Sequence, residues 1–118
     1  MSVQFILARY LPEFGDGKLD LYEAIKTGKK KVEYRTASDY WARRLLNKKG
    51  IEQYLRFKPY KAGGVIRFTY YEIKHHTAIF RVGYTKTPTL HVDINSIIWN
   101  LSEGQFEIHI ENVVEVVE

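Results

Sequence analysis

The sequence predicts an α+β fold in which several short strands form a small, closed or nearly closed β-barrel with two or three short helices. Apolar residues alternate with polar ones in several segments, as in strands that bury one face. Other segments carry apolar residues at helical spacing, which indicates amphipathic helices. The chain has 118 residues, 45% of them hydrophobic, enough for one ordinary core. We therefore expect a single domain over residues 1–118.

The first elements are predicted to be a strand, a short helix and the start of a second strand. Residues 3–9 are apolar at nearly every position, which favours a central strand covered on both sides. A loop with Pro and Gly follows, and residues 19–27 have the spacing of a helix, with Asp16 and Asp20 both candidates for its cap. Gly28 suits the left-handed residue just after a helix.

The middle of the chain predicts a second helix and a long hairpin. Ser38 is a good N-cap, and the helix that it begins is expected to end at Gly50. Residues 53–58 favour a strand. Residues 65–73 and 76–85 alternate and predict an antiparallel hairpin.

The C-terminal part predicts further strands. Residues 90–94 favour a short strand, residues 95–100 remain ambiguous, and residues 105–110 alternate before an apolar stretch at residues 113–117.

The charges are unevenly distributed along the chain. Between residues 18 and 67 lie 14 of the 18 Lys and Arg, with five acids, whereas residues 90–118 contain six acids and neither Lys nor Arg. This asymmetry predicts a basic face, which would attract phosphates with an affinity that falls as salt rises. It also predicts an acidic C-terminal face, which is a candidate surface for a protein partner.

Residues 28–35 read Gly-Lys-Lys-Lys-Val-Glu-Tyr-Arg and join a helix to a predicted strand over residues 30–35. An extended chain places Lys31, Glu33 and Arg35 on one side, with Lys30, Val32 and Tyr34 on the other. A Glu among cations has ready ion partners, and an Arg offers a planar fork to carboxylate or phosphate. The cluster is therefore either an ion network that holds the barrel shut or a ligand site.

Gly28, Lys30, Glu33 and Arg35 fit the pattern Gly-x-Lys-x-x-Glu-x-Arg, and here the chain resembles the ASCH domains, small β-barrels of the PUA-like superfamily. The run Tyr40-Trp41-x-Arg43-Arg44-Leu45 is similar to one in phage-type members. The resemblance implies a cleft between the helix end and the barrel that binds RNA or a modified nucleotide, without a cofactor. Lys30 and Arg35 would contact phosphate or a base there, and Glu33 would orient them or accept a base N–H.

The resemblance also implies an enzymatic alternative, in which Lys30 and Glu33 would be catalytic. One ASCH branch hydrolyses the acetyl group of N4-acetylcytidine and shares the lysine, but it has a threonine where this chain has Glu33. Another branch has ribonuclease activity that is ascribed to lysine and tyrosine; Tyr34, Tyr60 and Lys61 are candidates beside Lys30.

Aromatic and basic residues are interleaved from residue 34 to residue 61, a mixture typical of single-strand binding. Trp41 lies on the apolar stripe of its helix and is expected in the core. Tyr60 and Lys61, in a Gly-rich loop, are expected to contact the ligand, as is Arg43.

Several classes of site and location are not indicated. Without cysteine there is neither a disulfide nor a thiolate site, which favours a reducing cytoplasm. The four His lack the spacing of a metal site, and no phosphate loop or nucleophile elbow is present. Apolar runs are shorter than a membrane span, and the first residues do not read as a signal peptide.

Overall fold

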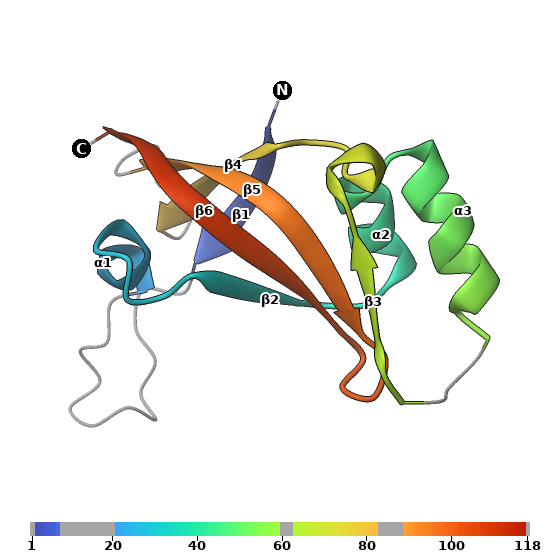
Figure 1. Ribbon diagram of the computed structural model, residues 1–118. Coiled ribbons are helices and arrows are strands. Elements are labelled where there is room, and N and C mark those ends of the chain that lie inside the picture. The colour runs from blue at the N-terminus through green and yellow to red at the C-terminus, as the bar shows by residue number, and fades with distance from the viewer. Residues whose placement is uncertain (1, 8–20, 60–62, 83–88, 118) are drawn as a thin grey trace.

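The computed structural model describes residues 2–7, 21–59, 63–82 and 89–117. They form a small α+β fold in which one sheet curls like half a barrel and helices pack at its ends (Figure 1). No helix among these residues is both long and apolar enough to cross a membrane. The elements, in chain order, are β1 (Val3–Leu7), α1 (Leu21–Lys26), β2 (Val32–Thr36), α2 (Asp39–Leu45), α3 (Lys48–Phe57), β3 (Val65–Phe68), the 3-10 turn η1 (Tyr70–Glu72), β4 (Thr77–Val82), β5 (Thr89–Asn100) and β6 (Gln105–Val117).

The strands follow the order β1-β4-β5-β6-β2, and β3 also pairs with β5. β1 and β4 are parallel, whereas the other pairs are antiparallel. β5 and β6 are the longest strands and form one curved hairpin (Figure 1). Its turn ends at Gly104, whose φ of 64° lies in the left-handed region that favours glycine.

The core lies inside the curl of the sheet. Alternate residues of β5 and β6 point inward, because successive side chains of a strand face opposite sides. Aromatic rings dominate the centre, where Phe5 and Phe80 stack with ring centroids 5.1 Å apart. The largest fully buried side chains are Phe5, Phe68, Phe80, Phe106, Ile25, Leu45, Leu46, Leu90, Ile97, Ile108 and Val92.

The first strand differs from the expectation of a central strand covered on both sides. β1 is the last strand at one end of the described sheet order, and its described portion spans residues 3–7. Val3 and Phe5 are buried, whereas Gln4 is exposed and 40% of the surface of Ile6 is exposed. The apolar side chain of Ile6 lies on the outer face of β1. It extends the apolar run in the sequence, and for this reason the sequence predicted a strand covered on both faces.

The predicted second helix is two helices. α2 ends at Leu45 because Leu46 is extended and forms a β-bridge with Ile73. Asn47 then caps α3, and its side-chain oxygen accepts from the Gly50 N–H at 3.0 Å. Gly50 therefore lies inside a helix rather than ending one, and the strand predicted over residues 53–58 is wrong.

The hairpin predicted from residues 65–73 and 76–85 is also wrong. β3 ends at Phe68, and both β3 and β4 pair with β5 instead of with each other. β3 and β4 run in the same direction along β5. Between them the Glu72 carboxylate accepts from the Thr69 N–H at 3.1 Å and closes the turn η1. Residues 95–100, ambiguous in sequence, continue β5.

We predict that Gly50→Ala destabilises the protein by about 2 kcal/mol, as overpacking typically does. A Cβ at Gly50 would lie 2.5 Å from the backbone carbonyl oxygen of Glu72. That clash outweighs the usual helix preference for alanine. Urea denaturation would measure the change. Gly63→Ala is the control, because its Cβ would meet nothing closer than Ser102 at 4.0 Å; equal effects of both substitutions would contradict the prediction.

Candidate functional site

The motif begins where α1 ends and β2 starts. Gly28 has a φ of 80°, and its N–H donates to the Ile25 carbonyl at 3.1 Å. The Lys30 N–H donates to the Ala24 carbonyl at 2.9 Å, which turns the chain back past the helix end. The predicted transition from helix to strand at Gly28 is therefore confirmed, although the strand itself begins at Val32.

Three motif side chains converge on the inner side of β2. Glu33 is buried, with 7% of its surface exposed, and its carboxylate lies 3.5 Å from Lys30 Nζ and 3.7 Å from Arg35 Nη2. Lys30 precedes the strand and so escapes its alternation, which is why it joins Glu33 although an extended chain would separate them. Lys31 is exposed, and the predicted grouping of Lys31 with Glu33 and Arg35 does not hold.

Arg35 links the two ends of the sheet order. Its Nη2 donates to the Ile6 carbonyl of β1 at 3.3 Å, while its own strand β2 pairs with β6 at the opposite end. The guanidinium carbon lies 5.1 Å from the ring centroids of both Phe5 and Trp41, a cation–π arrangement. The same side chain therefore contacts β1, α2 and the buried acid.

The ion network is incompletely hydrogen-bonded. Among the described residues, Glu33 Oε2 and Arg35 Nε are buried without a hydrogen-bond partner, whereas Glu33 Oε1 accepts from the Tyr34 N–H at 2.9 Å. A buried charge without its counter-charge costs several kcal/mol. Each member of the pair is therefore needed to keep the other in place.

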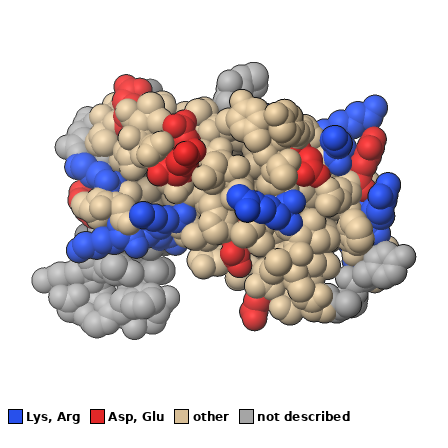
Figure 2. All heavy atoms as spheres, in the orientation of Figure 1, with Lys and Arg blue, Asp and Glu red and all other residues tan. Residues whose placement is uncertain are grey.

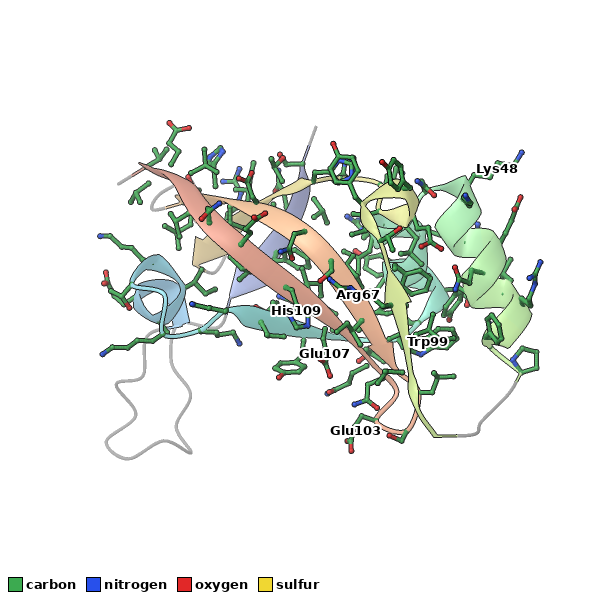
Figure 3. The ribbon with its side chains drawn as sticks, viewed as in Figure 1. Lys48, Arg67, Trp99, Glu103, Glu107 and His109 are labelled. Carbon is green, nitrogen blue, oxygen red and sulfur yellow. The ribbon has the colours of Figure 1, made fainter. Side chains whose placement is uncertain are left out.

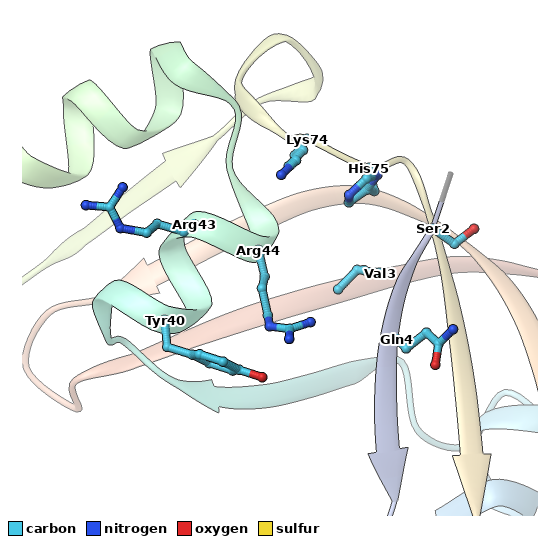
Figure 4. Close-up of a pocket in the computed structure, with 8 residues that line it drawn as sticks. All are labelled: Ser2, Val3, Gln4, Tyr40, Arg43, Arg44, Lys74 and His75. Carbon is cyan, nitrogen blue, oxygen red and sulfur yellow. The ribbon is translucent and has the colours of Figure 1, made fainter.

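Beside Arg35 the surface is hollowed between β1 and α2. The Arg35 hollow, of about 490 Å³, is lined by Gln4, Ile6, Arg35, Tyr40, Trp41 and Arg44. The Lys74 hollow, of about 480 Å³, is lined by Ser2, Val3, Gln4, Tyr40, Arg43, Arg44, Lys74 and His75 (Figure 4). Because they share Gln4, Tyr40 and Arg44, we treat them together as the β1–α2 groove.

The groove is basic and partly aromatic. Cations contribute to both hollows, and none of the described residues that line them is an acid. Tyr40 has 58% of its surface exposed. Its ring centroid lies 4.5 Å from the Arg44 guanidinium carbon. In Figure 4, Arg44 points toward β1, whereas the Arg43 guanidinium points away from it. This combination suits an anion that carries a flat ring.

Helix α2 is held in position by a contact on its other side. Asp39 accepts from Lys58 Nζ at 2.8 Å and from the Tyr54 hydroxyl at 3.0 Å, both on or next to α3. The hydrogen bond from Lys58, followed by that from Tyr54, lowers the pKa of Asp39. Burial, and then the bond to Asp39, raise the pKa of Tyr54 to about 12. The predicted N-cap of α2 is confirmed, because Ser38 Oγ accepts from the Trp41 N–H at 3.3 Å.

The predicted site residues fall into three groups. Arg35 and Arg43 line the groove, one in each hollow. Lys30 and Glu33 line neither hollow. Glu33 pairs with Arg35, and Lys30 pairs with Glu33. Tyr60 and Lys61 lie outside the described residues. Trp41, expected in the core, packs on Phe5 with centroids 5.4 Å apart and also lines the Arg35 hollow.

Sequence patterns could not identify the remaining groove residues. Tyr40 and Arg44 belong to the aromatic and basic run that the sequence shows, but nothing local distinguishes them from their neighbours. Gln4 and Lys74 carry no motif at all, because they come to the groove from β1 and from the chain between η1 and β4. Only the folded chain brings them beside α2.

The other charged surfaces do not form a comparable site. On the face in Figure 2, Lys and Arg lie over α1, over α3 and in the middle of the sheet, with acids interspersed, so this face is not purely basic. Glu107 and His109 lie together on β6 (Figure 3), with 3.6 Å between Oε1 and Nε2. No group of three potential metal ligands occurs in the described part of the chain. The acidic C-terminal face remains a prediction.

We predict that Arg35→Gln lowers the free energy of unfolding by about 3 kcal/mol, because the buried Glu33 loses one of its two cations and the link to the Ile6 carbonyl is lost. Lys31→Gln removes a neighbouring exposed cation and should change it by less than about 0.5 kcal/mol. Urea denaturation of both variants gives the comparison. Adding Glu33→Gln to Arg35→Gln should recover part of the loss, and a purely additive double variant would argue against the network.

We predict that high pH weakens the contact between Tyr54 and Asp39. Since the folded state raises the pKa of Tyr54 to about 12, its neutral form stabilises the fold at pH values below the ordinary tyrosine pKa of about 10. This contribution should be lost as the pH rises from about 10 to about 12. The difference in unfolding free energy between the protein and Tyr54→Phe should therefore shrink over that interval. A difference that is constant with pH would refute the proposed link.

Comparison of the chain with protein-family models, with curated proteins and with solved structures gives no match. What the β1–α2 groove binds is therefore inferred from the chemistry of its own residues.

Proposed function

We propose that this chain binds single-stranded RNA or a modified nucleotide, and that the β1–α2 groove is the binding site. The observation that carries the proposal is a hollow surface that the described residues line with cations and an exposed tyrosine, and with no acid. Arginine donates paired hydrogen bonds to phosphate, and an exposed ring stacks on a base of any sequence. The groove supplies both groups side by side, at Arg44 and Tyr40.

The proposal includes membership of the ASCH group and a PUA-like barrel. It is supported by the left-handed Gly28, by the passage from a short helix into the motif strand, and by the curl of the sheet. It is also supported by the convergence of Lys30, Glu33 and Arg35. In this proposal the first two motif side chains hold Arg35 in place, and Arg35 meets the ligand.

The enzymatic alternative has less support from the geometry. Lys30 pairs with Glu33, and neither residue lines a hollow among those that the described residues form beside β1. A general base must come within hydrogen-bond reach of the proton that it removes. Catalysis by Lys30 and Glu33 therefore stays a prediction from the resemblance.

Binding of a six-residue oligouridylate at low salt tests the proposal. Tyr40→Leu should weaken binding about tenfold, because one base loses its stacking partner. Arg44→Gln should weaken binding several-fold and reduce its salt dependence, because one phosphate contact is lost. Lys48→Gln is the matched control: it removes an exposed cation from the start of α3, away from the groove.

Three results would contradict the proposal. The first is absence of binding at low salt, and the second is equal weakening by Arg44→Gln and Lys48→Gln. The third is equally tight binding of an oligoglutamate with the same number of charges, because a groove that recognises charge alone would not need Tyr40.

A further inference from the structure

We infer that the β1–α2 groove accepts a strand of at least two linked nucleotides rather than a free mononucleotide. Arg44 would contact the phosphate between the two nucleosides, and Arg35 and Lys74 would contact the phosphates at either end. This inference rests on the proposed function and specifies the ligand of the same site.

The form of the groove favours a ligand of two linked units. The groove consists of two hollows of similar volume, about 490 and 480 Å³. The shared residues Gln4, Tyr40 and Arg44 stand at the boundary, so the ring and the guanidinium lie between the two spaces. Two units joined by a charged link match this arrangement, with one unit in each hollow.

The length of the groove along β1 also favours a ligand of linked units. The groove follows β1 from Ser2, in the Lys74 hollow, to Ile6, in the Arg35 hollow. Four residue steps at the rise of a strand span about 13 Å. One phosphate group contacts only one end of such a track, whereas a short strand can contact both ends.

Each of the three cations, Arg35, Arg44 and Lys74, is held in place separately. Arg35 is fixed by the Ile6 carbonyl and the Glu33 carboxylate. Arg44 lies over the Tyr40 ring. The Lys74 backbone N–H donates to the Leu45 carbonyl at 2.9 Å, which fixes Lys74 next to the end of α2. The three cations therefore come from β2, from α2 and from the chain between η1 and β4, and are spread along the groove.

Asp39, the acid on α2, does not neutralise the cations of the groove. Asp39 bonds to Lys58 and Tyr54, on the side of α2 that faces α3. Beyond those hydrogen bonds, the charge of Arg43 makes a small contribution to lowering the pKa of Asp39, and the Arg43 guanidinium points away from β1 in Figure 4. Arg43 is for that reason not counted among the three phosphate contacts.

Counterion release gives the expected salt dependence. For a single strand, the logarithm of the binding constant falls with the logarithm of the salt concentration with a slope of about −0.7 for each phosphate contacted. Three contacts give a slope of about −2. Lys74→Gln removes one contact and should reduce the slope to about −1.4, whereas Lys48→Gln should leave it unchanged.

The experiment compares uridine monophosphate with 5′-phosphorylated di-, tri- and hexauridylate over a range of salt concentrations. Affinity should rise at least tenfold from the monophosphate to the trinucleotide and change little from the trinucleotide to the hexanucleotide beyond the gain from additional binding registers. Lys74→Gln should weaken the trinucleotide several-fold and leave the monophosphate within twofold.

Equal affinities for the monophosphate and the trinucleotide, or equal slopes for Lys74→Gln and Lys48→Gln, would overturn this inference while the proposed function remained. If none of the uridylates binds at low salt, the proposed function fails with it.

Discussion

The contact between Arg35 and the Ile6 carbonyl is the constraint on which the rest of the site depends. The described sheet order runs from β1 to β2, and no backbone ladder joins those two strands. The Arg35 side chain, which lies over the rings of Phe5 and Trp41, connects the described portions of the two strands. Arg35 can do so because Glu33 provides a counter-charge in a largely buried position.

The groove is a consequence of this incomplete closure. A backbone ladder between β1 and β2 would place strands about 4.8 Å apart and leave no space beside Ile6. The Arg35 side chain of β2 instead reaches the Ile6 carbonyl of β1, and Tyr40, Trp41 and Arg44 of α2 line the space beside them. The hydrogen bonds of Asp39 with Lys58 and Tyr54 fix α2 against α3, so the wall that carries Tyr40 and Arg44 is rigidly supported.

In the proposed function, the motif has both of the roles that its sequence left open. Lys30 and Glu33 form the ion network that holds the fold, and Arg35 extends from that network into the groove. In the proposed function, the position of the ligand-contacting guanidinium is thus set by buried electrostatics. A substitution at Glu33 would act on binding through the position of Arg35, without touching a ligand.

Features that depend on neighbours in the chain were predictable from the sequence. Gly28 adopts the left-handed conformation, Ser38 caps α2, and alternation identifies the inward residues of β6, because each of these follows from the local backbone and its hydrogen bonds. The tertiary structure alone decided the position of β1, the break between α2 and α3, and the assembly of the groove. That break comes from a bridge between Leu46 and Ile73, and the groove joins Gln4 to Lys74; contacts over such separations depend on how the whole sheet curls, which no local pattern records.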